Sequence, residues 1–378
     1  MDKNKVVLRC FDMQKNLMIA GIVTGMLLGL IIPPIMLNVH AQGKIVINGA
    51  GATFPFPLID TWRVDYKTIK PDVDINYQSI GSGGGIKQFT AKTVDFGATD
   101  APLTALEAKS APGAVHIPET IGSVVAAYNI PSVPEKGLKL TGDVLADIYL
   151  GKITKWNDPK IVSLNPDKTL PGDDIVVVHR SDGSGTSFVW TDYLSNVSSA
   201  WKEQVGKGKS VSWPTGIGAP GNEGVANAIK GTANTIGYIE LNYALTTNTP
   251  FAFIKNKEGT FIEPSIASTK AAVAAVASQP GALPKGDGAW TNITMVNAPG
   301  NDSYSIASFS YLLLYKDMSN DPNLDEAKAK ALVDFISWAI TDGQKKGESL
   351  NYVPLPDNVV KLDQDTLKSL TFKGKPLL

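Results

Sequence analysis

The chain has 378 residues, of which 43% are hydrophobic and 19% are charged, a balance typical of a globular protein with about two domains or one large one. Its formal net charge of −1 argues against non-specific binding of nucleic acid, which needs clustered lysine and arginine. An anionic ligand would therefore have to be held by local groups and not by a general positive field.

Residues 1–41 have the order of an export signal. Basic side chains, among them Arg9, precede an apolar run over residues 17–32, and Val39-His40-Ala41 then offers a small-residue cleavage pattern. The alternative is a membrane anchor that is not removed, because the apolar stretch is nearly long enough to span a bilayer. In either case the positive end stays in the cytoplasm, and residues from 42 onward are expected in the periplasm or at the outer face of the cell membrane.

The only cysteine, Cys10, lies before the apolar run. The exported part therefore has no thiol, which excludes disulfides and cysteine-based catalysis or metal binding. After residue 41 only His116 and His179 remain as histidines, and their spacing assembles no metal cluster. We expect neither a metal nor a cofactor.

From residue 44 onward the pattern alternates strands, glycine-rich turns and helices. The elements expected in the first part are a strand at 44–48, a helix from about 57 that carries Leu58, Ile59, Trp62 and Tyr66 at helical spacing, a strand at 73–78, a turn at 81–85, a helix at 86–90, a strand at 94–98, and one or two apolar strands over 115–129. This alternation is the signature of an α/β sheet with crossover connections.

A second set of elements follows. They are a helix at 141–150 with Thr141 as its N-cap, a strand at 175–179, a turn at 180–186, helices at 187–194 and 222–229, a strand at 235–239, an apolar strand at 306–315, and helices at 325–340 and 358–370. The chain thus offers two α/β sets.

Two extended segments, residues 126–130 and 304–309, are the expected crossings between the two sets. Extended crossings are suited to act as a hinge that closes around a ligand. Lobe I would then comprise residues 42–126 and 307–378, and lobe II residues 127–306.

Three loops of one chemistry each follow a strand and open a helix. They are Gly51-Ala-Thr-Phe-Pro, Gly81-Ser-Gly-Gly-Gly and Asp182-Gly-Ser-Gly-Thr-Ser. The first turn of a helix carries unpaired N–H groups and a partial positive charge, and glycine lets a ligand approach the backbone closely. Each loop alone is also consistent with an ordinary capped turn. Together the three loops favour a tetrahedral oxyanion held by convergent helix N-termini.

Arg180 and Asp100 lie beside these loops. Arg180 ends a strand, and its guanidinium matches the oxygens of phosphate, although it could also simply pair with Asp182. Asp100 would repel a fully ionised anion, but an ionised aspartate can accept the proton of hydrogen phosphate. Sulfate has no such proton, so Asp100 would provide selectivity. The alternative role of Asp100 is that of a turn cap.

Several segments of the sequence, which include these residues, resemble segments of the substrate-binding protein of the phosphate ABC importer. The matching segments are Gly49-Ala-Gly-Ala-Thr-Phe-Pro, Tyr77-Gln-Ser-Ile-Gly-Ser-Gly-Gly-Gly, Val94-Asp-Phe-Gly-Ala-Thr-Asp-Ala-Pro-Leu, Asp147-Ile-Tyr-Leu-Gly-Lys-Ile-Thr-Lys-Trp-Asn-Asp, Arg180-Ser-Asp-Gly-Ser-Gly-Thr-Ser-Phe, Gly221-Asn-Glu-Gly-Val and Ile236-Gly-Tyr-Ile-Glu. The resemblance runs from about Ile47 to the C-terminus. It departs at Gly83, where the family often has a second serine.

The resemblance implies a type II periplasmic-binding-protein-like α/β fold with two lobes, each a β-sheet flanked by helices, and a ligand cleft at the hinge. It implies phosphate contacts from Thr53, Phe54 (through its backbone N–H), Ser82, Asp100, Arg180, Ser184, Gly185 and Thr186, with Asp182 pairing with Arg180 and moderating its charge. It further implies a monomer that delivers inorganic phosphate to the membrane permease subunits of the importer.

An enzyme and a structural surface protein are the rival hypotheses. Ser184, His179 and Asp182 could be imagined as a hydrolase triad, but neighbours on one strand and turn cannot be assumed to converge. The segment at 206–210 resembles half a phosphate-binding loop, yet Glu203 stands where that pattern needs glycine. A structural surface protein would have large exposed apolar patches and no small-ligand cleft. We therefore expect a binding protein that is not an enzyme.

Overall fold

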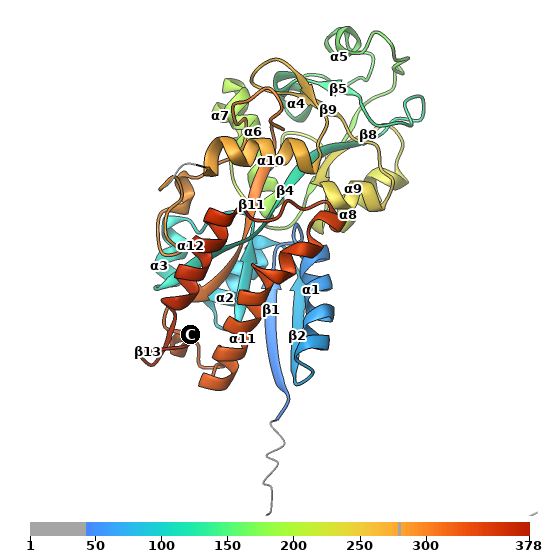
Figure 1. Cartoon of the computed structure of the whole chain (residues 1–378). Coiled ribbons are helices and arrows are strands. Elements are labelled where there is room, and N and C mark those ends of the chain that lie inside the picture. The colour runs from blue at the N-terminus through green and yellow to red at the C-terminus, as the bar shows by residue number, and fades with distance from the viewer. Residues whose placement is uncertain (1–42, 279–280) are drawn as a thin grey trace, which may run out of the picture. The chain divides into compact units, whose positions relative to one another are not determined.

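The structure, a computed structural model, describes residues 43–278 and 281–378, in which strands and helices alternate (Figure 1). The strands are β1 (Ile45–Gly51), β2 (Val73–Ser79), β3 (Phe96–Thr99), β4 (Ala114–Asn129), β5 (Lys139–Leu140), β6 (Val176–Arg180), β7 (Ile217–Ala219), β8 (Thr235–Glu240), β9 (Phe253–Lys255), β10 (Phe261–Ile262), β11 (Ala307–Tyr315), β12 (Thr371–Phe372) and β13 (Lys375–Pro376). The helices are α1 (Phe56–Ile69), α2 (Ser82–Thr90), α3 (Ala105–Ser110), α4 (Gly142–Tyr149), α5 (Pro159–Leu164), α6 (Gly185–Val197), α7 (Ser199–Gln204), α8 (Gly221–Gly231), α9 (Leu241–Thr246), α10 (Ile266–Ala277), α11 (Glu326–Ala339) and α12 (Asp357–Lys368).

The main sheet has the strand order β2-β1-β3-β11-β4-β8-β6-β7. Strands β1, β2 and β3 are parallel to one another, and so are β6, β7 and β8. Between these groups, β11 is antiparallel to β3 and β4, and β4 is antiparallel to β8. The two parallel groups therefore run in opposite senses, and the carboxyl ends of their strands face each other.

Strand β4 belongs to both halves of the sheet. It pairs with β11 over residues 114–123 and with β8 over residues 124–129, and Figure 1 shows β4 and β11 running between the two groups of elements. Of the one or two strands expected over 115–129, the structure therefore has one continuous strand. Residues 43–378 form one compact unit by their contacts, so the boundaries of lobe I and lobe II stay a prediction.

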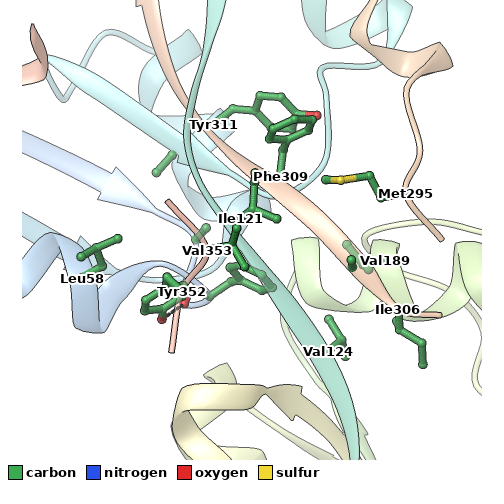
Figure 2. Packing of buried hydrophobic residues seen from close by; sticks show 14 of the residues in the cluster. Leu58, Ile121, Val124, Val189, Met295, Ile306, Phe309, Tyr311, Tyr352 and Val353 are labelled. Atoms are coloured by element: carbon green, nitrogen blue, oxygen red, sulfur yellow. Dashed lines mark hydrogen bonds between the residues drawn. The ribbon is translucent and has the colours of Figure 1, made fainter. Parts of the chain in front are cut away.

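A buried apolar cluster surrounds the point where β4 changes partner. Figure 2 shows Ile121 and Val124 of β4 among the side chains of Leu58, Val189 and Tyr352, which come from distant parts of the chain, and each of the five is exposed by 2% or less. The core therefore holds together the elements that carry the candidate site.

The helices expected at the two glycine-rich loops begin earlier than expected. Helix α2 begins at Ser82 and not at 86, and α6 begins at Gly185 and not at 187. Glycine and serine favour turns locally. They are also tolerated in the first turn of a helix, because the N–H groups there have no intrahelical partner in any case. The four apolar residues expected on one face of α1 are all buried. Thr141 lies at the N-cap position of α4, but its side chain forms no capping hydrogen bond.

The expected export signal or anchor, residues 1–41, lies outside the described residues. Within residues 43–278 and 281–378, no helix combines the length and the apolar character that a membrane crossing requires.

Candidate functional site

The candidate residues lie where strands end. Thr53 and Phe54 follow β1, Ser82 opens the helix after β2, and Asp100 follows β3. On the opposite side, Arg180 ends β6 and the loop that follows it leads into α6. Because the carboxyl ends of the two strand groups face each other, the fold brings these corners together, as α/β folds commonly do at ligand sites.

Asn222 joins the two sets of corners. Its side-chain Nδ2 donates to Thr53 Oγ1 at 2.8 Å and to Thr186 Oγ1 at 3.1 Å, and its Oδ1 accepts from the backbone N–H of Glu240 at 3.0 Å. Thr53 and Asn222 are 169 positions apart in the chain. A single amide group therefore fixes two hydroxyl groups from opposite parts of the site.

The hydrogen bonds to these hydroxyl groups determine where their protons point. Thr53 Oγ1 accepts from both the backbone N–H and the Nδ2 of Asn222, at 3.2 and 2.8 Å. Thr186 Oγ1 accepts from Asn222 Nδ2 at 3.1 Å and from Arg180 Nη1 at 3.3 Å. A hydroxyl has two acceptor positions and one proton. With both acceptor positions used, each proton is left to donate to an anion.

Two helix N-termini meet at the site. Ser184 caps α6 by accepting from the Ser187 N–H at 3.0 Å, and the Gly83 N–H in the first turn of α2 donates to the Gly183 carbonyl at 2.8 Å. A Cβ on Gly185 would overlap Ser82 Oγ and an oxygen of Asp100. Glycine is required there because the first turn of α6 lies directly against these groups.

Arg180 and Asp182 form a bidentate pair. Arg180 Nε donates to Asp182 Oδ1 at 2.7 Å and Nη2 donates to Oδ2 at 2.5 Å, and the side chain of Arg180 is 1% exposed. Burial opposes ionisation of Asp182, but the hydrogen bonds and charge of Arg180 and the Gly221 N–H outweigh burial and lower the pKa of Asp182. The remaining guanidinium nitrogen of Arg180, Nη1, donates to Thr186 Oγ1.

Asp100 is a buried carboxyl group at the same place. Its backbone N–H donates to Ser82 Oγ at 3.2 Å, and Ser310 Oγ contacts its Oδ1 at 2.9 Å. Burial raises the pKa of Asp100 to about 7, while Ser310, the charge of Arg180 and Ser82 act in the opposite direction. Asp100 can therefore exchange a proton near neutral pH.

Phe54 contributes only backbone groups to the site. Its side chain is buried, its ring lies 6.3 Å from that of Tyr352, and its carbonyl accepts from the Tyr352 hydroxyl at 2.6 Å. The carbonyl of Thr53 likewise accepts from the Tyr243 hydroxyl at 2.6 Å. These tyrosines fix the turn after β1 and so orient its N–H groups.

Sequence reasoning missed the structural role of Asn222 and did not find Ser310 or Glu119. The segment that starts at Gly221 is recognisable only through its resemblance to the family, since an asparagine at the start of a helix is locally an ordinary residue. Ser310 lies inside an apolar strand and Glu119 within another. No local pattern distinguishes these two residues from other polar residues in strands.

The hydrolase triad is not formed. His179 stacks on Trp213 with ring centroids 4.9 Å apart, and its Nδ1 lies 3.0 Å from the Arg180 carbonyl. Ser184 caps a helix and Asp182 pairs with Arg180. Among the described residues, no group of three or more histidine, cysteine or acidic side chains is arranged to hold a metal ion.

Comparison with known proteins identifies the family. A family model described as the PBP superfamily domain matches residues 38–342. The phosphate-binding protein PstS of Pasteurella multocida is 44% identical over 344 residues, which cover 91% of this chain and 95% of that protein. The chain belongs to the PstS family of phosphate-binding proteins. The family resemblance seen in the sequence is thereby confirmed.

Solved structures support the same fold. The structure of a high-affinity periplasmic phosphate-binding protein with phosphate bound matches with a TM-score of 0.64 at 19% identity, and the match covers 88% of this chain and 100% of that one. A phosphate-binding protein from Stenotrophomonas maltophilia has a TM-score of 0.61 at 19% identity, covering 84% of this chain and 92% of that one. At this identity the likeness concerns the fold alone, and it confirms the expected periplasmic-binding-protein-like α/β fold.

Proposed function

We propose that this PstS-family chain binds inorganic phosphate between the facing strand ends and delivers it to the membrane permease of a phosphate ABC importer. The observation that supports this most strongly is the convergence of a buried arginine, two hydroxyl groups with their protons left to donate, and two helix N-termini. Such a set replaces the water around a tetrahedral anion without a surplus of positive charge.

The expected contacts use each group according to its chemistry. The anion receives hydrogen bonds from the hydroxyl groups and N–H groups at three strand-to-helix corners and from one guanidinium. The proposed ligand-binding residues are Thr53, Phe54, Ser82, Asp100, Arg180, Ser184, Gly185 and Thr186. Asp182 moderates the charge of Arg180, so that the site stays buried without an unpaired cation.

Asp100 gives the site its selectivity. A bound hydrogen phosphate donates its proton to Asp100 when this carboxyl is ionised. Sulfate, which carries no proton at neutral pH, would place an unprotonated oxygen against a buried carboxylate. The positive field of Arg180 favours the ionised form of Asp100 and therefore this donation.

In the proposed complex, phosphate contacts residues that precede the first expected crossing in the chain and residues that follow it, and so both proposed lobes. Because it makes these contacts together only when the lobes are closed, its binding favours the closed arrangement. The permease would recognise that arrangement. We infer a monomeric binding protein that works outside the cytoplasm, without cofactor or catalytic residues and without nucleic acid as a partner, and whose residues 1–41 are either removed or kept as an anchor.

Calorimetric titration of the purified protein with phosphate and with sulfate tests the proposal. We expect phosphate to bind at least about 100-fold more tightly than sulfate, because a site built to pair with a ligand proton rejects the analogue that lacks it. In Asp100→Asn this ratio should shrink. Equal affinity of the wild-type protein for both anions would remove the role assigned to Asp100, and the absence of phosphate binding would refute the proposal.

A further inference from the structure

A β-bulge in β4 places a second carboxyl group behind Asp100. In the pairing of β4 with β11, Thr120 lies opposite Ser310 and Pro118 lies opposite Tyr311, so that Glu119 is the extra residue. A bulge redirects the side chain of the strand that carries it, and bulges are frequent beside functional sites. The side chain of Glu119 is 0% exposed, and its Oε1 lies 3.0 Å from Ser310 Oγ.

Ser310 therefore stands between two carboxyl groups. Its Oγ is 2.9 Å from Asp100 Oδ1 and 3.0 Å from Glu119 Oε1. A serine hydroxyl has one proton and an ionised carboxylate can only accept. If both acids were ionised, one of the two contacts would set an oxygen lone pair against a carboxylate in a buried place, which is costly. Hence one of the two carboxyl groups carries a proton.

The surroundings assign this proton to Glu119. Asp100 is stabilised in its ionised form by the charge of Arg180 and by the Ser82 hydroxyl. Within the described part of the chain, the Oε2 of Glu119 is buried without a hydrogen-bond partner, and Ser310 is the one side chain that forms a hydrogen bond with its Oε1. Burial, together with the negative charge of Asp100, raises the pKa of Glu119 to about 8, against the effect of Ser310.

Several other titratable groups face this pair. Glu240 of β8 is fully buried and burial raises its pKa well above the usual value. Burial likewise raises the pKa of the tyrosines that face Asp100, Glu119 or Glu240, so they keep their protons at neutral pH. These tyrosines are Tyr77, Tyr243, Tyr311 and Tyr352. Arg180, paired with Asp182, is the cation that acts on Asp100.

We propose that Glu119 is a positioning residue that donates a hydrogen bond to Ser310, which in turn donates a hydrogen bond to Asp100 and holds this carboxylate ready to accept the proton of the ligand. The inference rests on the proposed function, because it concerns how the phosphate site sets its own protonation. The other oxygen of Asp100 stays turned toward Ser82 and Gly185, where the ligand would lie.

The consequence is a loss of phosphate affinity at alkaline pH. When Glu119 loses its proton, a second negative charge appears behind Asp100 and the hydroxyl of Ser310 can no longer donate to one carboxylate while accepting from the other. The dianion of phosphate bound nearby favours the protonated form of Glu119, so binding takes up a proton from solvent. The contribution of the Glu119 proton to affinity is then complete below the pKa of Glu119 in the free protein and falls as the pH rises above it.

Glu119→Gln tests this arrangement, because glutamine keeps the shape and donates to Ser310 at every pH. From pH 8 to pH 9.5, where phosphate remains the dianion, we expect the wild-type dissociation constant for phosphate to rise about 15-fold if the complex stays protonated. For Glu119→Gln we expect less than about a threefold change. Asp363→Asn is the matched control, since Asp363 is also a fully buried acid of raised pKa, in α12 and outside the site. Its pH profile should follow the wild type.

A second measurement counts the protons taken up on binding. Calorimetry of the wild-type protein at pH 8.5 in two buffers of different ionisation enthalpy should show uptake of about 0.7 proton per phosphate bound, and Glu119→Gln should show almost none. Phosphate binding without proton uptake, or with the same pH slope in both proteins, would overturn the role of Glu119 and leave the proposed function intact. A wild-type protein that binds no phosphate at all would refute the proposed function itself.

Discussion

Asn222→Ala separates the binding role of Asn222 from its structural role. The alanine variant loses three side-chain hydrogen bonds, to Thr53, to Thr186 and from the Glu240 N–H, at distances of 2.8 to 3.1 Å. At about 0.5–1.5 kcal/mol each, we expect the free energy of unfolding of the ligand-free protein to fall by about 2–4 kcal/mol. Urea unfolding measures this loss.

The effect of Asn222→Ala on affinity is smaller and has a different origin. The hydrogen bond from Asn222 to Thr53 joins residues on opposite sides of the expected crossings, so it stabilises the arrangement that is closed around the ligand. It also orients the hydroxyl proton of Thr53. Losing one such bond of about 1–1.5 kcal/mol should raise the dissociation constant for phosphate about 5- to 12-fold. Calorimetric titration at one fixed pH and ionic strength measures it.

Asn165→Ala is the control for this prediction. Asn165 is 0% exposed and its side chain also makes three hydrogen bonds, to both backbone groups of Lys139 and to the Ile161 carbonyl. We expect a similar loss of stability and an unchanged affinity for phosphate. Phosphate binding by Asn222→Ala as tight as that of the wild type, or an equal weakening by Asn165→Ala, would contradict a role of the Asn222–Thr53 bond in ligand binding.

Two further predictions concern charge. Arg180→Ala should weaken phosphate binding by at least about 1.5–3 kcal/mol in a calorimetric titration, the usual worth of hydrogen bonds to charged groups, whereas Arg63→Ala, which removes an exposed arginine paired with Asp60, should not. Between pH 4.5 and about 8 the folded protein keeps a proton on Glu119 that the unfolded chain releases, so this group makes stability fall as the pH rises through that window. Urea unfolding of Glu119→Gln should show a pH slope of stability that is smaller by up to about 1.4 kcal/mol per pH unit. An unchanged slope would contradict the protonation assigned to Glu119.

Much of the fold followed from local patterns. Helix α1, with Leu58, Ile59, Trp62 and Tyr66 on its buried face, and strand β2 after it could be predicted because apolar residues recur with the period of each element. The starts of α2 and α6 could not, since Ser82 and Gly185 belong to residue types that favour turns and the first helical turn alike. Their exact place depends on the packing of each corner against the other.

The sequence by itself determined which chemistry stands at the strand ends: small residues and hydroxyl groups at helix starts, one arginine and one aspartate. Only the tertiary structure decided how these groups act. Asn222 reaches Thr53 across 169 positions and Glu119 reaches Ser310 across 191. Such contacts depend on strand order, register and a single bulge, which arise from packing of the whole chain and leave no local pattern.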